Sequence, residues 1–432
     1  MHAAGRGFES PRLHAFRVAE KGGDEARIGP TKMKKALNVF EKTTVLSVEQ
    51  ATTLPFLTYR LAVDGMNVIR VENPHRPDPN RFVGDDVLGE EGMNTYFLPL
   101  NVGKKSITLN LASEEGRSLL KEVIRGLDVD VFATNQLQKG CVKAGIDYET
   151  LREVKEDIIW LGITGFGPDC SEAAYDPVLQ ARAGLMDLTG EPDGGPMLLG
   201  LPVADLLGGE HAYSEVMKAL FRREATGEGC RIDVSMFRSI VSWLHTPLAL
   251  TVTFDYRLSR SGNTHRFFAP VSVFETADGY VYIAVGSDRQ WDSMTRLPGF
   301  ESLRKKEYER NAGRIADVEA LNRRINEITR TLTSAELVET LRKIKVPASE
   351  VKSVRDVAGD PHICGNLLRS TDPVSGLEMA LPPPPVVTSY LKRRGMTVPF
   401  PPRLGEHNRR IYGDLLGRSE EELESLARKG VI

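Results

Sequence analysis

Asp176 is the residue in this sequence best placed to take part in a reaction. It lies between Tyr175 and Pro177, after a buried apolar strand expected over residues 158–163 and before a helical segment over residues 178–186. Open α/β sheets place reactive groups where a buried strand ends beside a helix N-terminus. A carboxylate at this point can also simply cap the helix, with Pro177 in the first helical position. Local sequence alone favours the capping role.

The elements that must position Asp176 predict a parallel α/β sheet. Strands are expected over residues 44–48 and 67–72, with a helix over residues 50–64 between them that ends at Gly65. A strand, a helix and a strand within about thirty residues form a βαβ unit, and such units make parallel sheets. The first strand is not followed by a GxGxxG pattern, which disfavours a nucleotide-binding oxidoreductase.

Length, charge and cysteine usage exclude several classes of protein. The chain has 432 residues, which predicts at least two domains, and its net charge of -3 offers no basic field for nucleic acid or a membrane surface. No apolar run approaches transmembrane length. The four cysteines form no CxxC pair and no Cys/His cluster at metal-ligand spacing. We therefore expect a cytoplasmic protein with reduced thiols and no metal site.

Shifts in composition divide the chain into segments. Residues 1–35 are expected to be a disordered extension. Residues 36–240 form the first part of a large α/β domain. Residues 258–345 carry antiparallel strands joined by an Asp-Gly turn, then charged helices, and are predicted to form a smaller α+β domain. Residues 346–432 are expected to be a linker and a return to the large domain.

The run from Gln180 to Gly194 carries a resemblance to a known family. It reads Gln-Ala-x-x-Gly-Leu-Met-x-x-Thr-Gly-x-Pro-Asp-Gly and follows directly on the Tyr175-Asp176 pair. This arrangement resembles the class III CoA-transferases, the family of formyl-CoA transferase and carnitine CoA-transferase, to which the α-methylacyl-CoA racemases are related. The resemblance extends from about residue 36 to the end of the chain. It implies that Asp176 is the nucleophilic aspartate of the family.

The reaction implied by the resemblance moves CoA from an acyl-CoA donor to a carboxylic acid. It passes through a mixed anhydride and an aspartyl-CoA thioester on Asp176. CoA and acyl-CoA are then substrates, and no metal or permanently bound cofactor is implied. We favour succinyl-CoA as the donor and an aromatic or branched acid as the acceptor.

Further residues are expected around Asp176 in the substrate pocket. Gly165 and Gly167 could present N–H groups to developing oxyanions, or they are ordinary loop glycines. Tyr175 stands where racemases typically have histidine. Because a free phenol has a pKa of about 10, it is a poor base at neutral pH, which favours a transferase over a racemase. Asp205 is expected to hydrogen-bond a turn at Gly208-Gly209.

The resemblance also implies contacts to CoA. Gln50 matches a glutamine after the first strand, although Thr52-Thr53 replaces a common Gly-Pro pair. Asn135 and Lys143 fit a later segment, in which Gln136 replaces an aromatic residue. The CoA phosphates need cations near the pocket mouth. The candidates are Arg70, Lys104, Lys105, Lys139 and Lys143. Each lysine can equally be a solvated surface charge.

The family fold is the architecture we expect. It is a Rossmann-like parallel-sheet large domain formed by N- and C-terminal segments, with a smaller α+β domain, in an interlocked dimer of ring-like chains. The partner is a second copy or a related subunit. A second hypothesis is that this chain is a non-catalytic subunit of a heteromer, which the changes at Thr52-Thr53, Gln136 and Gln138 favour and the retained Asp176 opposes. An acyl-CoA racemase is the least favoured alternative.

Overall fold

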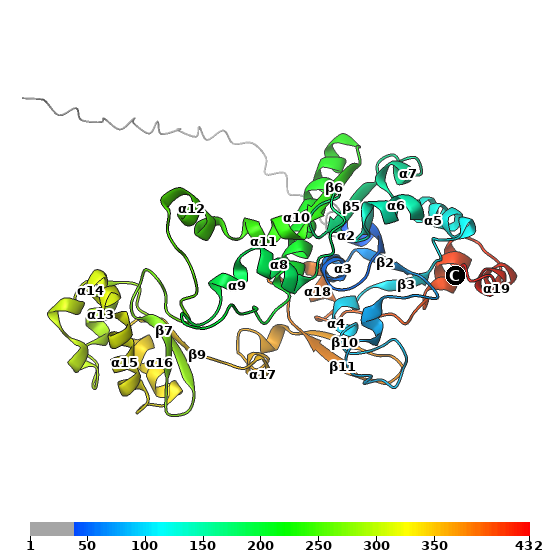
Figure 1. The fold of residues 1–432 in the computed structure, drawn as a ribbon. Coiled ribbons are helices and arrows are strands. Elements are labelled where there is room, and N and C mark those ends of the chain that lie inside the picture. The colour runs from blue at the N-terminus through cyan, green and yellow to red at the C-terminus, as the bar shows by residue number, and fades with distance from the viewer. Residues whose placement is uncertain (1–38) are drawn as a thin grey trace, which may run out of the picture. The chain divides into compact units, whose positions relative to one another are not determined.

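A six-stranded sheet is the largest element of the computed structural model, which describes residues 39–432 (Figure 1). The extension expected over residues 1–35 lies outside them. The strand order is β3-β2-β1-β4-β5-β6, and every pair is parallel. The strands are β1 (Thr44–Val48), β2 (Asn67–Glu72), β3 (Lys105–Thr108), β4 (Val131–Thr134), β5 (Ile159–Thr164) and β6 (Cys230–Ser235). The predicted parallel sheet is confirmed. In this doubly wound order, ligands bind at the carboxyl edge between β1 and β4, where the connections that follow the two strands run in opposite directions along the sheet.

Helices cover both faces of this sheet because its strands are apolar on both sides. Val45 and Val131 pack on one face with the helices α3 (Thr53–Val63), α8 (Asp176–Arg182), α10 (Val203–Thr226) and α11 (Met236–Ser242). Leu46 and Phe132 pack on the other face with α5 (Glu114–Gly126) and with residues of α19 (Glu420–Arg428). The C-terminal residues therefore share a core with α5.

A second, antiparallel sheet has its own core. Its strand order is β7-β8-β9, and its apolar face packs Phe274, Val281 and Ile283 with Trp291 and Leu337. The elements are β7 (Val271–Glu275), β8 (Tyr280–Ala284), α13 (Asp288–Met294), α14 (Asn311–Ala316), α15 (Val318–Thr329), α16 (Ser334–Lys343) and β9 (Ala348–Glu350). The predicted antiparallel pair is confirmed. The third strand, β9, lies beyond residue 345, where we expected this region to end.

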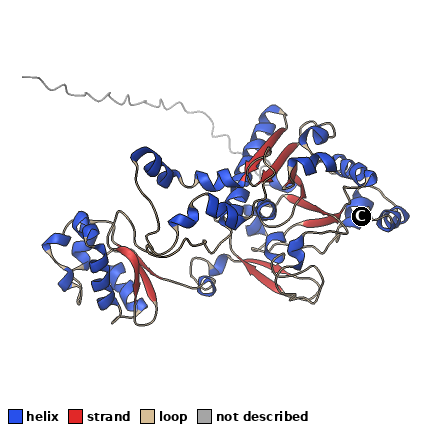
Figure 2. Cartoon of the chain, viewed as in Figure 1, coloured by secondary structure: helices blue, strands red, loops and turns tan. Residues whose placement is uncertain are grey.

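Short elements complete the described chain (Figure 2). The helices are α2 (Val39–Lys42), α4 (Leu98–Asn101), α6 (Gln138–Ala144), α7 (Tyr148–Arg152), α9 (Leu185–Leu188), α12 (His245–Phe254), α17 (Val354–Val357) and α18 (Ser389–Arg393). The 3₁₀ helices are η1 (Pro79–Phe82), η2 (Glu301–Leu303), η3 (Lys306–Tyr308) and η4 (Cys364–Asn366), and η5 (Arg409–Leu415) is a π-helix. β10 (Leu368–Thr371) and β11 (Glu378–Leu381) form an antiparallel hairpin. None of the helices in residues 39–432 is long and apolar enough to cross a membrane.

The turn expected at Gly208-Gly209 is the clearest error in the predicted elements. α10 runs without a break from Val203 to Thr226, and both glycines lie inside it. A Cβ atom at Gly209 would lie 2.8 Å from Phe56 Cδ1 and 2.9 Å from the carbonyl oxygen of Thr53. The glycines are therefore needed for the close packing of α10 on α3 and not for a turn.

Candidate active site

Two cavities open at the carboxyl edge of the parallel sheet. The first cavity has a volume of about 660 Å³ and is lined by residues that follow β1, β2, β3 and β4 and by α6. The second cavity has a volume of about 790 Å³ and is lined by residues that follow β1, β4 and β5, including Asp176. Gln50, in the loop between β1 and α3, lines both. The two cavities therefore meet at the carboxyl edge between β1 and β4, as the strand order predicts.

Asp176 is held in the second cavity by three uncharged donors. Its side chain is 7% exposed, so it is enclosed but still reached from the cavity. Oδ1 accepts hydrogen bonds from the N–H groups of Ala204 at 2.6 Å and Asp205 at 3.4 Å, in the first turn of α10. Oδ2 accepts from Gln180 Nε2 at 2.7 Å. The N-cap of α8 is Tyr175, and Asp176 does not cap that helix. The capping role that local sequence favours is therefore wrong.

Gln180 fixes the orientation of the Asp176 carboxylate. It is fully buried, and its Nε2 also donates to the carbonyl oxygen of Leu201 at 3.1 Å. Its Oε1 accepts from the N–H group of Leu199 at 3.2 Å. These contacts determine which end of the amide faces Asp176. Because Leu199 and Leu201 line the second cavity, the same side chain joins the cavity wall to the carboxylate.

Asp205 is a second carboxyl group in the same cavity. Its Oδ1 accepts a hydrogen bond from Thr53 Oγ1, at the start of α3. Burial and, less strongly, the charge of Asp176 raise the pKa of Asp205 to about 6, against the lowering effect of the Thr53 hydroxyl. The expected contact with a Gly208-Gly209 turn does not exist because α10 is continuous there. Asp205 is therefore part of the cavity and not of a turn.

The loop residues expected around Asp176 divide into two groups. Gly165 lines the second cavity, and a Cβ atom there would lie 2.1 Å from the Cβ of Ala174. Tyr175 also lines this cavity, but its side chain is 74% exposed and closes off little of it. Gly167 is not among the lining residues, and its N–H group donates to Thr164 Oγ1 at 3.1 Å. The structure thus differs from the expectation that Gly167 offers an oxyanion donor.

Gln50 and Asn135 lie together at the junction of the two cavities. Asn135 Nδ2 donates to the carbonyl oxygen of Gln50 at 2.8 Å, and its Oδ1 accepts from the N–H group of Gln50 at 3.2 Å. This pair of bonds ties the loop after β1 to the loop after β4. The Gln50 side chain is exposed and free to contact a ligand in either cavity.

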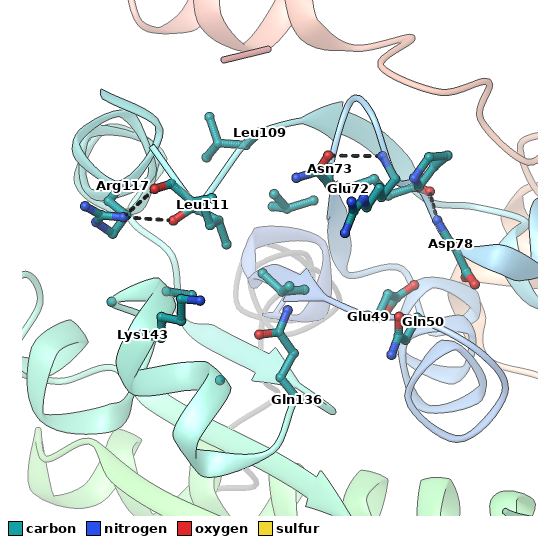
Figure 3. Close-up of a pocket in the computed structure, with 18 of the residues that line it drawn as sticks. Glu49, Gln50, Glu72, Asn73, Asp78, Leu109, Leu111, Arg117, Gln136 and Lys143 are labelled. Atoms are coloured by element: carbon teal, nitrogen blue, oxygen red, sulfur yellow. Dashed lines mark hydrogen bonds between the residues drawn. The ribbon is translucent and has the colours of Figure 1, made fainter. Parts of the chain in front are cut away.

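Three cations line the first cavity together with three carboxylates, and Figure 3 labels Arg117 and Lys143 among the cations. Lys143 on α6 and Arg76 after β2 line it and are exposed. Arg117 on α5 also lines it, with Nη1 donating to the carbonyl oxygens of Leu111 at 3.1 Å and Ala112 at 3.0 Å. Guanidinium and ammonium groups at a cavity mouth bind phosphate through charge-assisted hydrogen bonds. The first cavity therefore suits a phosphorylated ligand.

The expected phosphate contacts Arg70 and Lys104 lie in the protein interior instead. They belong to a buried charge cluster of three cations and three carboxylates, which we define as Arg70, Arg81, Lys104, Glu49, Glu72 and Asp78. Arg70 lies 3.0 Å from both Glu72 and Asp78, and Lys104 Nζ lies 2.8 Å from Glu49. Although burial opposes it, Arg70 and Arg81 lower the pKa of Glu72 to about 2. Because the charges in the cluster are matched, neither predicted cation is free to bind phosphate.

The other two predicted cations also lie away from the cavities. Lys105 begins β3, at the amino edge of the sheet, and its Nζ donates to Asn67 Oδ1. Lys139 is exposed on α6 and lines neither cavity. Lys143 lies one turn further along the same helix and faces the first cavity. Of the five predicted cations, Lys143 alone is positioned for a ligand there.

Gln180, Arg76 and Arg117 are the site residues that sequence reasoning missed. Gln180 follows Asp176 by four residues in a predicted helix, and this spacing places both side chains on one face. Arg76 follows the strand expected to end at residue 72, a position that faces the carboxyl edge. Nothing in the local sequence distinguishes Arg117 from other arginines on exposed helix faces. Within residues 39–432, no group of three or more His, Cys, Asp or Glu residues could hold a metal ion.

The fold and the two cavities agree with a match to a known family. Residues 40–408 match the model of CoA-transferase family III. The chain therefore belongs to this family and is a CoA-transferase. The resemblance inferred from residues 175–194 is confirmed.

Individual relatives support the same class. The chain is 30% identical to the succinate–glutarate CoA-transferase of Agrobacterium fabrum over 385 residues, which cover 86% of this chain and 94% of that protein. It is 34% identical to the succinyl-CoA:mesaconate CoA-transferase of Haloarcula hispanica over 332 residues, which cover 74% and 82%. Among solved structures, a CAIB/BAIF family protein from Brucella suis superimposes with a TM-score of 0.76 at 30% identity, covering 87% of this chain and 99% of that one.

Proposed function

We propose that this chain moves CoA between an acyl-CoA and a carboxylic acid through an aspartyl-CoA thioester on Asp176. The observation that carries the proposal is the carboxylate itself. It is enclosed, oriented by three neutral donors, and exposed to a cavity that meets a cation-lined cavity at Gln50. The pantetheine thiol of a CoA bound in the first cavity would reach Asp176 past Gln50.

The hydrogen bonds of Asp176 suggest separate roles for its two oxygens. In the first step Oδ2 of Asp176 attacks the thioester carbonyl and the C–S bond breaks. The CoA thiolate departs, and Asp176 and the acyl group are joined in a mixed anhydride. In the second step the thiolate attacks the Asp176 carbonyl carbon, and Oδ2 departs with the donor acid. The negative charge that develops on Oδ1 during this attack faces the N–H groups of Ala204 and Asp205. The charge on the departing Oδ2 faces Gln180 Nε2. The acceptor acid then reverses both steps.

The CoA nucleotide belongs to the first cavity in this proposal. Arg76, Arg117 and Lys143 replace Arg70, Lys104, Lys105 and Lys139 as the cations for its phosphates. The second cavity takes the acyl group. Its wall includes hydroxyl and amide groups, with Thr52 Oγ1 3.3 Å from the hydroxyl of Tyr96.

A short dicarboxylic acid is the substrate class that this wall favours. The relatives are named for succinate, glutarate and mesaconate, and hydroxyl and amide donors suit a second carboxylate better than an aromatic ring. We propose succinyl-CoA as the donor and a short dicarboxylic acid as the acceptor, in place of the aromatic or branched acid expected above. A cytoplasmic location stays a prediction.

A second copy of the chain is the proposed partner. None of the residues of α12 is buried although the helix is largely apolar. Exposed fractions are 76% for Val252 and 64% for Phe254 on α12, and 65% for Trp243, which follows α11 and precedes α12. A surface of this kind is typical of a subunit interface. The alternative, a heteromer with a related subunit, predicts that the purified chain alone stays monomeric in sedimentation velocity.

The covalent intermediate gives the direct test. The chain is incubated with succinyl-CoA, and intact-mass spectrometry with peptide mapping follows. We expect a CoA-sized adduct on the peptide that contains Asp176, absent from Asp176→Asn and present in Asp193→Asn, an exposed aspartate that lines neither cavity. A folded dimer that forms no adduct would contradict the proposal and favour the non-catalytic subunit.

A further inference from the structure

The second cavity must hold a carboxylate beside Asp176, but its lining supplies no cation. In the described part of the chain, its charged lining residues are Glu172, Asp176 and Asp205, and no Lys or Arg lines it. Asp176 carries no charge in the enzyme–CoA thioester, so a substrate carboxylate at this position would meet the carboxyl group of Asp205 at close range. Binding then requires a neutral hydrogen-bond donor next to Asp176.

Asp205 is the side chain whose position meets this requirement. Its N–H group donates to Oδ1 of Asp176, so its side chain leaves the backbone next to that carboxylate. Thr53 Oγ1 donates to Oδ1 of Asp205 and fixes the orientation of the carboxyl group. No group among residues 39–432 donates to Oδ2 of Asp205, although the residue lines the cavity. One oxygen of Asp205 is therefore anchored and the other is available to a ligand.

We propose that Asp205 binds the acid substrate as a neutral carboxyl group, donating a hydrogen bond from Oδ2 to the reacting carboxylate beside Asp176. This inference rests on the proposed function and adds a residue that recognises the acid. The proton enters with the acid anion from solvent and leaves with the product acid, so each binding event takes up one proton. No proton is transferred to the reacting carbon centres.

The charges around Asp205 agree with a neutral carboxyl group. In the free enzyme, the elements packed against the first turn of α10 direct one unpaired charge at Asp205, that of Asp176 on α8, and this charge is lost in the enzyme–CoA thioester. Their cations are engaged or lie elsewhere: Arg60 of α3 pairs with Glu210, Arg182 of α8 pairs with Glu172, and Arg238 of α11 is exposed outside the cavity. In the free enzyme burial, and less strongly the charge of Asp176, raise the pKa of Asp205 to about 6, and the effect of burial persists in the thioester. A substrate anion beside it would raise the pKa further, as in a pair of carboxyl groups that share one proton.

The consequence is a specific pH dependence for binding of the acid. In the enzyme–CoA thioester the charge of Asp176 is absent, so the pKa of Asp205 lies below its value in the free enzyme. Above that pKa Asp205 loses its proton, and each acid molecule must bring one. The KM for the acid should therefore increase about tenfold per pH unit. Asparagine at this position keeps a neutral donor that does not titrate. In Asp205→Asn the KM should be independent of pH across the same range.

The experiment separates the two half-reactions. The wild-type chain, Asp205→Asn and Thr53→Val are first converted to the enzyme–CoA thioester with succinyl-CoA, and transfer to glutarate is then measured from pH 6 to 8.5. We expect the wild-type KM for glutarate to increase with pH and the KM of Asp205→Asn to be flat. In Thr53→Val the rise should begin at a higher pH, because the Thr53 hydroxyl lowers the pKa of Asp205. Thr53→Val keeps the volume of threonine, so it supplies the test if Asp205→Asn fails to fold.

Each outcome bears on a different claim. A normal thioester with a wild-type KM that does not change with pH would overturn the role of Asp205. A pH dependence that persists in Asp205→Asn would do the same, because the proton would then belong to another group. Failure of the wild-type chain to form any thioester would overturn the proposed function, and this inference with it.

Discussion

Replacement of Gln180 by methionine tests how the Asp176 carboxylate is oriented. Methionine is unbranched and similar in size to glutamine but cannot donate to Oδ2, which lies 2.7 Å from Nε2 in the wild type. In the proposed mechanism this donor meets the charge on the departing oxygen. A hydrogen bond to a charged group contributes about 1.5–3 kcal/mol. At 1.36 kcal/mol per factor of ten, thioester formation in Gln180→Met should slow about 10- to 150-fold.

The assay is the rate of CoA adduct formation on Asp176 in a single turnover with succinyl-CoA. Gln138→Met is the matched control, because Gln138 lies on α6 and lines neither cavity. Its adduct rate should stay at the wild-type value. Gln180→Met also leaves the N–H group of Leu199 and the carbonyl of Leu201 without their partner. We therefore expect a loss of stability of about 1–3 kcal/mol per group and would measure rates well below the unfolding transition.

A rate within a factor of two of the wild type, in a folded Gln180→Met chain, would refute this reasoning. It would mean that the N–H groups of α10 orient Asp176 without help. A slower rate that is restored by Gln180→His, which keeps a ring N–H donor, would in contrast strengthen the assignment of Gln180 as a positioning residue.

Three further predictions concern the charge cluster, the first cavity and the interface. Lys104→Met leaves Glu49 buried with Arg70 3.7 Å away as its remaining cation. The free energy of unfolding in urea should therefore decrease by about 3–5 kcal/mol, whereas that of Lys139→Met should stay at the wild-type value. Equal stabilities of the two variants would contradict the buried pairing. Arg76→Ala should raise the KM for acyl-CoA about tenfold at low salt and less at high salt. An unchanged KM would place the phosphates elsewhere. Trp243→Asp should shift the sedimenting species from dimer to monomer, and a persistent dimer would exclude this face from the interface.

The parallel sheet was predictable because its signal is local. The first two strands coincide with the apolar runs at residues 44–48 and 67–72. Helix ends were less predictable. The expected helix over residues 178–186 is two helices, α8 and α9, since Gly184 adopts a left-handed conformation with φ +78°. The role of Gly208 and Gly209 could not be predicted from local sequence, because it depends on packing against α3, which lies about 150 residues earlier in the chain.

The predicted site was accurate where a long motif surrounds the residue and inaccurate where a single charge was read alone. Asp176 belongs to the first kind. Arg70 belongs to the second, although a sign was present: an arginine between Ile69 and Val71 lies inside a buried apolar strand. A cation in that position must be matched by buried carboxylates. The sequence does not say which carboxylates those are, since Asp78 and Glu49 come from separate loops.

The cations of the buried charge cluster lie near the site but line neither cavity, and the cluster holds a loop of the site in place. Glu49 directly precedes Gln50, and Asp78 Oδ1 accepts a hydrogen bond from the N–H group of Ala51 at 3.2 Å. Ala51 adopts φ +64°, which a non-glycine residue holds only where its surroundings enforce it. The cluster therefore fixes the turn from Gln50 to Thr53. That turn presents Gln50 to both cavities and Thr53 to Asp205. The charge cluster that includes Arg70 and Lys104 therefore holds the segment that joins the CoA side of the site to the acid side.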